Sequence, residues 1–114
     1  MLTIDALNAF GANTDEGLGR CFDNEGFYLK LVKVVPDEKN FDALKEAVDR
    51  GDLAAGFEAA HALKGVLANL SLTALMEPAS EITENLRAGK QIDYDPLIEK
   101  LFAKREELRK LCEE

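Results

Sequence analysis

The sequence predicts an all-α protein, an antiparallel up-and-down four-helix bundle with a short extra helix at the N-terminal end. Apolar residues recur with the helical period of 3.6 along most of the chain. No segment alternates apolar and polar residues for long enough to form a strand, and no Asn-Gly or Asp-Gly hairpin signal occurs. The breaks between helical segments are only a few residues long, which favours antiparallel neighbours.

The N-terminal half contains three predicted helices. The first is short and is broken by the segment 10–17, FGANTDEG; its apolar positions are Leu2, Ile4 and Leu7. Asp23 or Asn24 caps the second helix, because a side-chain oxygen there accepts a hydrogen bond from the first turn. The apolar positions of this helix are Phe27, Leu31 and Val34, with Tyr28, Val32 and Val35 beside them. Pro36 ends the helix or bends it sharply. The third helix covers 41–50 and carries on one face Phe41, Leu44 and Val48.

A long predicted helix covers 53–70. Gly51 suits the left-handed position that closes the preceding helix, and Asp52 suits the N-cap of this one. Its inward stripe consists of Leu53, Gly56, Phe57, Ala60, Leu63, Leu67 and Leu70.

Two further helices complete the predicted bundle. The segment 71–89 forms one of them and ends at Gly89; its inward residues are Leu75, Ile82 and Leu86. Pro78 lies inside this pattern, so it kinks the helix or marks its true start. Asp95 and Pro96 open the last helix as N-cap and first residue. This helix carries Leu97, Leu101 and Leu108, with Ile98 and Phe102 alongside.

Length and charge narrow the class of protein. The 114 residues suit one domain, 1–114, with a single core. The 22 acidic residues against 14 basic ones give a formal net charge of −8, which argues against nucleic acid or an anionic membrane as partner. The opening segment lacks the features of a secretory signal, and no apolar run is long enough to span a membrane. Cys21 and Cys112 are expected to be free thiols of a cytoplasmic protein, with a disulfide between them as the alternative.

The only histidine of the chain, His61, lies at the edge of the buried stripe of the helix 53–70. The residues that share its face at i−7, i+4 and i+7 are Ala54, Gly65 and Ala68, and all three are small. The imidazole is therefore expected to stand clear of its surroundings, with room for another protein. Lys64, at i+3, can reach the same patch with its ammonium group.

Gly65 requires an explanation outside the helix, because glycine in a helix interior is less favourable than alanine by about 1 kcal/mol. Close approach of a partner provides that explanation. A neutral imidazole with a free lone pair is a nucleophile near physiological pH. If that nitrogen takes up a phosphoryl group, Lys64 would help to neutralise the new charge. Phe57, at i−4 from His61, borders the expected docking surface.

The segment 60–71, AHALKGVLANLS, resembles the active-site helix of histidine-containing phosphotransfer (HPt) domains. The pattern of that family is His-x-x-Lys/Arg-Gly followed by small and apolar residues, often Asn-Leu-Gly. The matching residues are His61, Lys64, Gly65, Asn69 and Leu70. The resemblance continues through 16–32, 41–65 and 80–90, and so covers most of the chain. Two residues depart from the family pattern: Ser71 stands where a glycine is usual, and Pro78 stands where the helix is commonly unbroken.

The resemblance implies a four-helix bundle that takes a phosphoryl group on His61 from a receiver-domain aspartate and passes it to another receiver domain. Lys64 would stabilise the charge, and the docking residues would be Phe57, Ala54, Gly65 and Ala68. The resemblance implies no kinase activity, and the sequence has neither a Walker loop nor a kinase glycine-rich loop. It implies no cofactor or metal of its own, since the receiver domain supplies the metal. Response-regulator receiver domains are the expected partners, a hybrid histidine kinase is a further candidate, and the protein is expected to be a monomer.

The alternative function is a helical interaction module that binds a receiver domain or another partner without taking phosphate. Other classes have less support. A zinc site needs three or four ligands, so His61 would have to recruit carboxylates or the distant cysteines. No serine lies on a nucleophile elbow, which disfavours Ser/His/Asp hydrolysis.

Overall fold

The computed structural model describes residues 1–113. Within this range the chain is all-helical, with seven α-helices, one short 3-10 turn and no strand. The elements are α1 (Ile4–Phe10), α2 (Thr14–Arg20), α3 (Glu25–Lys33), η1 (Val35–Asp37), α4 (Lys39–Asp49), α5 (Leu53–Asn69), α6 (Thr73–Arg87) and α7 (Asp95–Glu113). Over residues 1–113, none of these helices has the length and apolar character that crossing a membrane requires.

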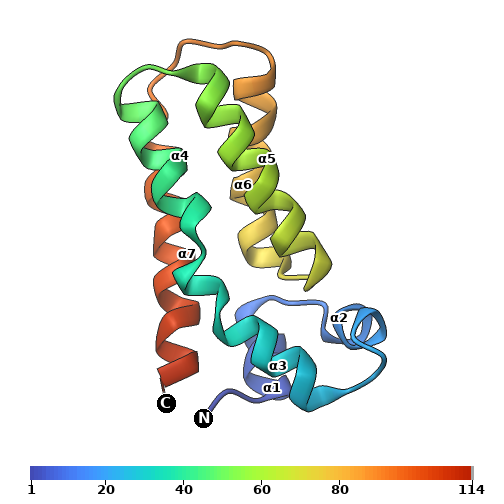
Figure 1. Ribbon diagram of the computed structural model, residues 1–114. Coiled ribbons are helices and arrows are strands. Elements are labelled where there is room, and N and C mark those ends of the chain that lie inside the picture. Colours follow the sequence, from blue (N-terminus) through green and yellow to red (C-terminus); the bar gives the residue numbers. More distant parts are fainter. Residues whose placement is uncertain (114) are drawn as a thin grey trace.

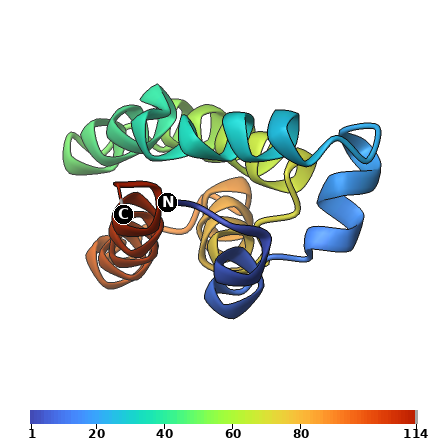
Figure 2. The ribbon, with the colours of Figure 1, turned by 90° about the horizontal axis from the view of Figure 1, so that it is seen from below.

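The last four helices, α4 to α7, form the antiparallel up-and-down bundle that the sequence predicts (Figure 1). Seen from below, α4 and α5 make one layer, and α6 and α7 make the other (Figure 2). Helices α1 to α3 cover one end of the bundle, and both termini lie at this end (Figures 1 and 2). The all-α bundle class is therefore confirmed, although three helices, α1 to α3, precede the bundle where the prediction has a single short extra helix.

Local sequence signals set most of the helix ends as predicted. Asn24, rather than Asp23, is the N-cap of α3, and its Oδ1 accepts a hydrogen bond from the amide of Phe27 at 3.0 Å. Gly51 is left-handed, with φ of 75°, and the next residue, Asp52, caps α5. Gly89 is also left-handed, and it follows Ala88, the C-cap residue of α6. Such ends satisfy backbone groups that a helix leaves without partners.

One helix start differs from the prediction, and the structure decides a second point that the prediction left open. Helix α7 begins at Asp95 itself, one residue earlier than expected. Helix α6 begins at Thr73, so Pro78 does not mark its start. Pro78 is instead buried inside α6, where its ring nitrogen has no hydrogen to donate to the carbonyl of Ala74.

The short helix α2 lies in a region for which the sequence predicts no helix. Its seven residues include Gly17 and Gly19, and it has no clear apolar period. Its contact with α3 accounts for it: a Cβ atom on Gly17 would lie 2.6 Å from the Tyr28 ring. A helix this short is not stable alone, so packing against α3 decides its conformation.

Helix α3 buries only one of the two apolar stripes seen in its sequence. Tyr28 and Val32 are fully buried. Phe27 and Val34, by contrast, are 43% and 62% exposed. Because the two stripes are adjacent on the helix, periodicity alone cannot say which one faces the core.

The corner between α5 and α6 joins the bundle to the N-terminal helices. Ser71 has φ of 54°, the left-handed conformation for which the family usually has glycine. Its hydroxyl donates a hydrogen bond to Glu16 Oε1 at 2.8 Å, and its carbonyl accepts one from the amide of Asn13 at 2.9 Å. The Tyr28 hydroxyl donates to the carbonyl of Leu70 at 2.8 Å. These bonds offset the strain of a left-handed serine, roughly 1–2 kcal/mol.

The contact between α4 and α7 is aromatic. The rings of Phe41 and Phe102 meet edge to face, with centroids 5.9 Å apart. The guanidinium of Arg105 lies over both rings, 4.3 Å from the centroid of Phe102 and 5.1 Å from that of Phe41. Each such contact stabilises the packing by about 0.5–1 kcal/mol.

The two cysteines are free thiols, as predicted: Cys21 is buried and Cys112 is half-buried.

Candidate functional site

His61 lies in the middle of α5, and its side chain is exposed. Among the described residues, neither ring nitrogen of His61 has a hydrogen-bond partner. The helix itself is held by the buried residues of its opposite face, among them Leu63 and Leu67. The imidazole is thus fixed to a rigid element while its ring nitrogens stay open to an incoming group.

The small residues predicted around His61 share its face of the helix. Ala54 and Gly65 are exposed, and Ala68 is half-buried. A Cβ atom built on Gly65 would meet no other atom within 4 Å, and its φ is not left-handed. Neither packing nor backbone conformation therefore requires a glycine here. The face of α5 at Gly65 is thus open, with no neighbouring element of residues 1–113 packed on it.

Lys64 is half-buried one turn after His61. None of the ion pairs in the described part of the chain involves Lys64 or His61. The ammonium group of Lys64 is therefore not engaged by a carboxylate of residues 1–113. A new anion on His61 would meet a cation that has no competing partner in this range.

The structure adds a contact that the sequence does not reveal. The Phe57 ring stacks on the imidazole of His61, with centroids 5.6 Å apart and an angle of 19° between the planes. The guanidinium of Arg87, at the end of α6, lies over the same Phe57 ring at 5.0 Å from its centroid. Arg87 Nε also bonds to Glu84 Oε2 at 3.2 Å. Arg87, on α6, therefore contacts the aromatic ring that packs against His61 on α5.

An apolar groove lies between α3 and the C-terminal half of α5. One hollow, of about 250 Å³, includes Leu31, Val34, Val66 and Asn69 among its lining residues. A second, of about 330 Å³, shares Leu31 and Asn69 and adds Phe27. We call these five residues, Phe27, Leu31, Val34, Val66 and Asn69, the α3–α5 groove. It begins about one turn beyond His61 along α5, so one partner could cover both.

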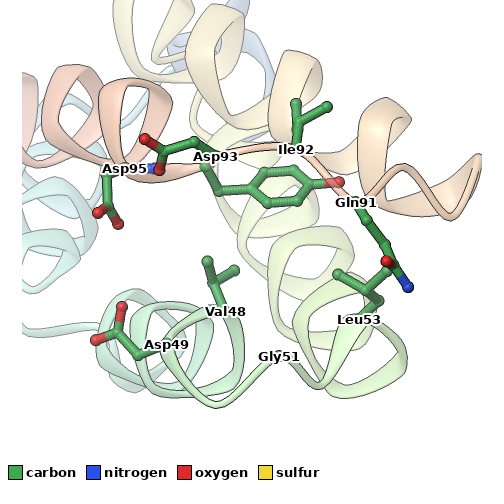
Figure 3. A pocket seen from close by; sticks show the side chains of 9 residues that line it. Val48, Asp49, Gly51, Leu53, Gln91, Ile92, Asp93 and Asp95 are labelled. Carbon is green, nitrogen blue, oxygen red and sulfur yellow. The ribbon is translucent and has the colours of Figure 1, made fainter.

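A different hollow, of about 490 Å³, lies at the far end of the bundle (Figure 3). Three carboxylates, those of Asp49, Asp93 and Asp95, stand around it (Figure 3). Among residues 1–113, no three or more His, Cys, Asp or Glu side chains are grouped so that they could hold a metal ion. Leu53, which also lines it, precedes His61 by eight residues, about 12 Å along the helix axis. This hollow is therefore separate from the histidine.

Sequence reasoning missed two parts of the site. Arg87 is the only basic residue of α6. This isolated charge is the one feature of the sequence that could have pointed to its contact with Phe57. The exposure of Phe27 and Val34 in the α3–α5 groove depends on which stripe of α3 is buried. Both features arise from how helices pack together, and not from the pattern within one helix.

Comparison with known proteins gives one match. A family model described as Hpt domain matches residues 38–114. This range holds all four helices of the bundle, together with His61 and Lys64, and leaves α1 to α3 outside. No match was found among curated proteins or among solved structures.

Proposed function

The chain belongs to the Hpt domain family, and on this premise we propose that it is a phosphorelay intermediary with His61 as its phosphoryl acceptor. Hpt domains are phosphotransfer carriers of two-component signalling, and they act with receiver domains and kinases. One observation carries the proposal for this chain. Its only histidine is exposed on a rigid helix among small residues, and both ring nitrogens lack a partner among the described residues.

The proposed step is an in-line transfer from an aspartyl phosphate. The exposed nitrogen of His61 attacks the phosphorus, a nitrogen–phosphorus bond forms, and the bond from phosphorus to the aspartate oxygen breaks. The aspartate leaves as a carboxylate, and the imidazole carries the phosphoryl group. The reverse step delivers this group to the aspartate of a second receiver domain, so the protein itself is unchanged after the cycle.

Lys64 has the role of a neighbouring cation. A phosphoryl group adds close to two negative charges at neutral pH, on a protein whose formal charge is already −8. In water, an exposed pair of this kind stabilises by at most about 1 kcal/mol. When a receiver domain covers the site, water is excluded, and the same charge stabilises the transition state more strongly.

The docking surface proposed for the receiver domain has two parts. The first is the set of residues around His61, namely Ala54, Phe57, Gly65 and Ala68. The second is the α3–α5 groove, where Phe27 and Val34 expose apolar surface. Contiguous exposed apolar patches are typical of protein–protein interaction sites. The acidic net charge argues against nucleic acid as a partner. We also propose that the protein acts as a monomer in the cytoplasm.

Phosphotransfer from a panel of phosphorylated receiver domains tests the proposal. At least one receiver should lose its phosphoryl group to the protein within a single turnover. Receivers that bind the protein but transfer nothing would support the alternative, an interaction module that takes no phosphate. A receiver domain with its phosphorylated aspartate replaced by asparagine is the control, because it cannot carry the group.

A further inference from the structure

The His61 imidazole stacks on the ring of Phe57, which favours one orientation of the imidazole. The 5.6 Å centroid separation and the 19° angle between the ring planes lie in the range of attractive aromatic pairs. An exposed histidine otherwise rotates widely about its second side-chain torsion, which has a broad energy profile. The stack covers one face of the imidazole and leaves its edge, which bears the nitrogens, uncovered.

The plane of the imidazole matters for the transfer. The lone pair of a ring nitrogen lies in the plane of the ring, so the attacked phosphorus must lie in that plane as well. A ring held in one plane before docking has less rotational freedom to lose when the transition state forms. Phe57 is placed to supply this restraint from the preceding turn of the same helix.

Phe57 is in turn restrained from a second helix. Its side chain is half-buried, and the guanidinium of Arg87 lies 5.0 Å from its ring centroid. A cation over an aromatic face is attractive, so Arg87 favours the ring position that stacks on His61. The carboxylate of Glu84 holds the guanidinium at 3.2 Å. A series of contacts therefore connects Arg87 on α6, through Phe57, to the imidazole of His61.

We propose that Phe57 is a positioning residue for phosphoryl transfer, which fixes the plane of the His61 imidazole, and that Arg87 acts on the imidazole through Phe57. The proposal rests on His61 being the phosphoryl acceptor. It assigns Phe57 an effect on the transfer step beyond its place in the proposed docking surface, whereas docking alone would affect mainly the affinity for the receiver.

The first test is kinetic. Phe57→Leu keeps an apolar side chain but removes the stack, and Phe57→Tyr keeps the ring. At saturating phosphorylated receiver, we expect Phe57→Leu to transfer about tenfold more slowly, with receiver affinity changed less than about twofold, and Phe57→Tyr to recover most of the rate. Phe102→Leu is the matched control, since it removes an aromatic and cation–π contact that does not involve the His61 face; it should leave the transfer rate unchanged. An unchanged rate in Phe57→Leu, or a loss confined to affinity, would overturn the proposal.

The second test needs no phosphate. Because the chain has one histidine, the imidazole carbon-bound protons give two unambiguous signals in a proton NMR spectrum. The Phe57 ring current should hold them upfield, so Phe57→Leu should move them downfield while Phe102→Leu does not. Unmoved signals would show that the stack is absent in solution. If no receiver phosphorylates the parent protein, the proposed function fails, and this spectrum still reports on the stack alone.

The part played by Arg87 is tested by a double-mutant cycle. Arg87→Met keeps the length of the side chain and removes its charge. It should slow transfer in the parent by about two- to fivefold and have no effect in the Phe57→Leu background. A loss of equal size in both backgrounds would show that Arg87 does not act through Phe57.

Discussion

Replacing Gly65 by alanine or glutamine should raise the stability of the protein and lower its rate of phosphoryl transfer. The stability part follows from the structure around this residue. A Cβ atom on Gly65 meets no atom within 4 Å, so a side chain is added without a clash. The backbone is helical, and glycine in a helix interior is less favourable than alanine by about 1 kcal/mol. Gly65→Ala should therefore gain this full difference in stability, which corresponds to a rise in Tm of about 4 °C.

The transfer part follows from the position of Gly65 one turn from His61. A glutamine at this position stands on the face that the receiver must cover, whereas alanine adds only one methyl group. We expect Gly65→Ala to slow transfer modestly and Gly65→Gln to slow it at least tenfold, about 1.4 kcal/mol in the barrier. Thermal melts followed by circular dichroism give the first quantity, and single-turnover transfer from a phosphorylated receiver gives the second.

Gly56 provides the control on the same helix. It is buried on the inner side of α5, and a Cβ atom there would lie 3.5 Å from the nearest atoms of Leu86, which is ordinary contact. Gly56→Ala should therefore gain helix stability without slowing transfer. Transfer by Gly65→Gln at the parental rate would refute the argument that this glycine exists for access. A fall in Tm for Gly65→Ala would refute the structural part.

Three further predictions concern Lys64, Tyr28 and Ser71. Lys64→Ala should slow single-turnover transfer by ten- to a hundredfold, about 1.4–2.8 kcal/mol, and Lys64→Arg should recover part of the rate; an alanine variant as fast as the parent would show that the charge has no role. Burial raises the pKa of Tyr28 from its ordinary 10.0 to about 12, with a smaller contribution from Cys21. Because the folded state holds this proton more tightly, its contribution to stability is complete below pH 10 and is lost as the pH rises from about 10 to 12. At neutral pH, Tyr28→Phe should be less stable than the parent by about 1–2 kcal/mol. In denaturant titrations between about pH 10 and 12, however, it should lose less stability than the parent. Equal losses of stability in the two proteins over this range would contradict the prediction. Ser71→Ala keeps the left-handed strain and loses the bond to Glu16, so it should unfold about 1–2 kcal/mol more easily. Ser71→Gly relieves the strain and should lie within about 1 kcal/mol of the parent, and equal stabilities of the two variants would be inconsistent with a strained serine.

The bundle could be predicted from the sequence because its helices carry their own signals. The order of α4 to α7 follows from apolar periodicity and from short connections that contain Gly51 and Gly89. His61 could likewise be singled out, since its small neighbours occur at helical spacings that need no knowledge of other helices. Features confined to one helix could therefore be predicted from the sequence.

The features that could not be predicted from the sequence depend on contacts between helices. Helix α2 has a weak pattern of its own and depends on the fit of Gly17 against Tyr28. The position of Arg87 over Phe57 requires the packing of α6 against α5. Ser71, unusual for the family, becomes understandable only with Glu16, which lies 55 residues away along the chain.

The most direct test of the account is to find where the phosphoryl group goes. The parent protein and His61→Gln are incubated with a receiver domain phosphorylated with labelled phosphate, and the products are treated with acid and with alkali. The account predicts a label on the parent that acid removes and alkali does not, as for a phosphoramidate, and no label on His61→Gln. Label that persists on His61→Gln, or that resists acid on the parent, would contradict it.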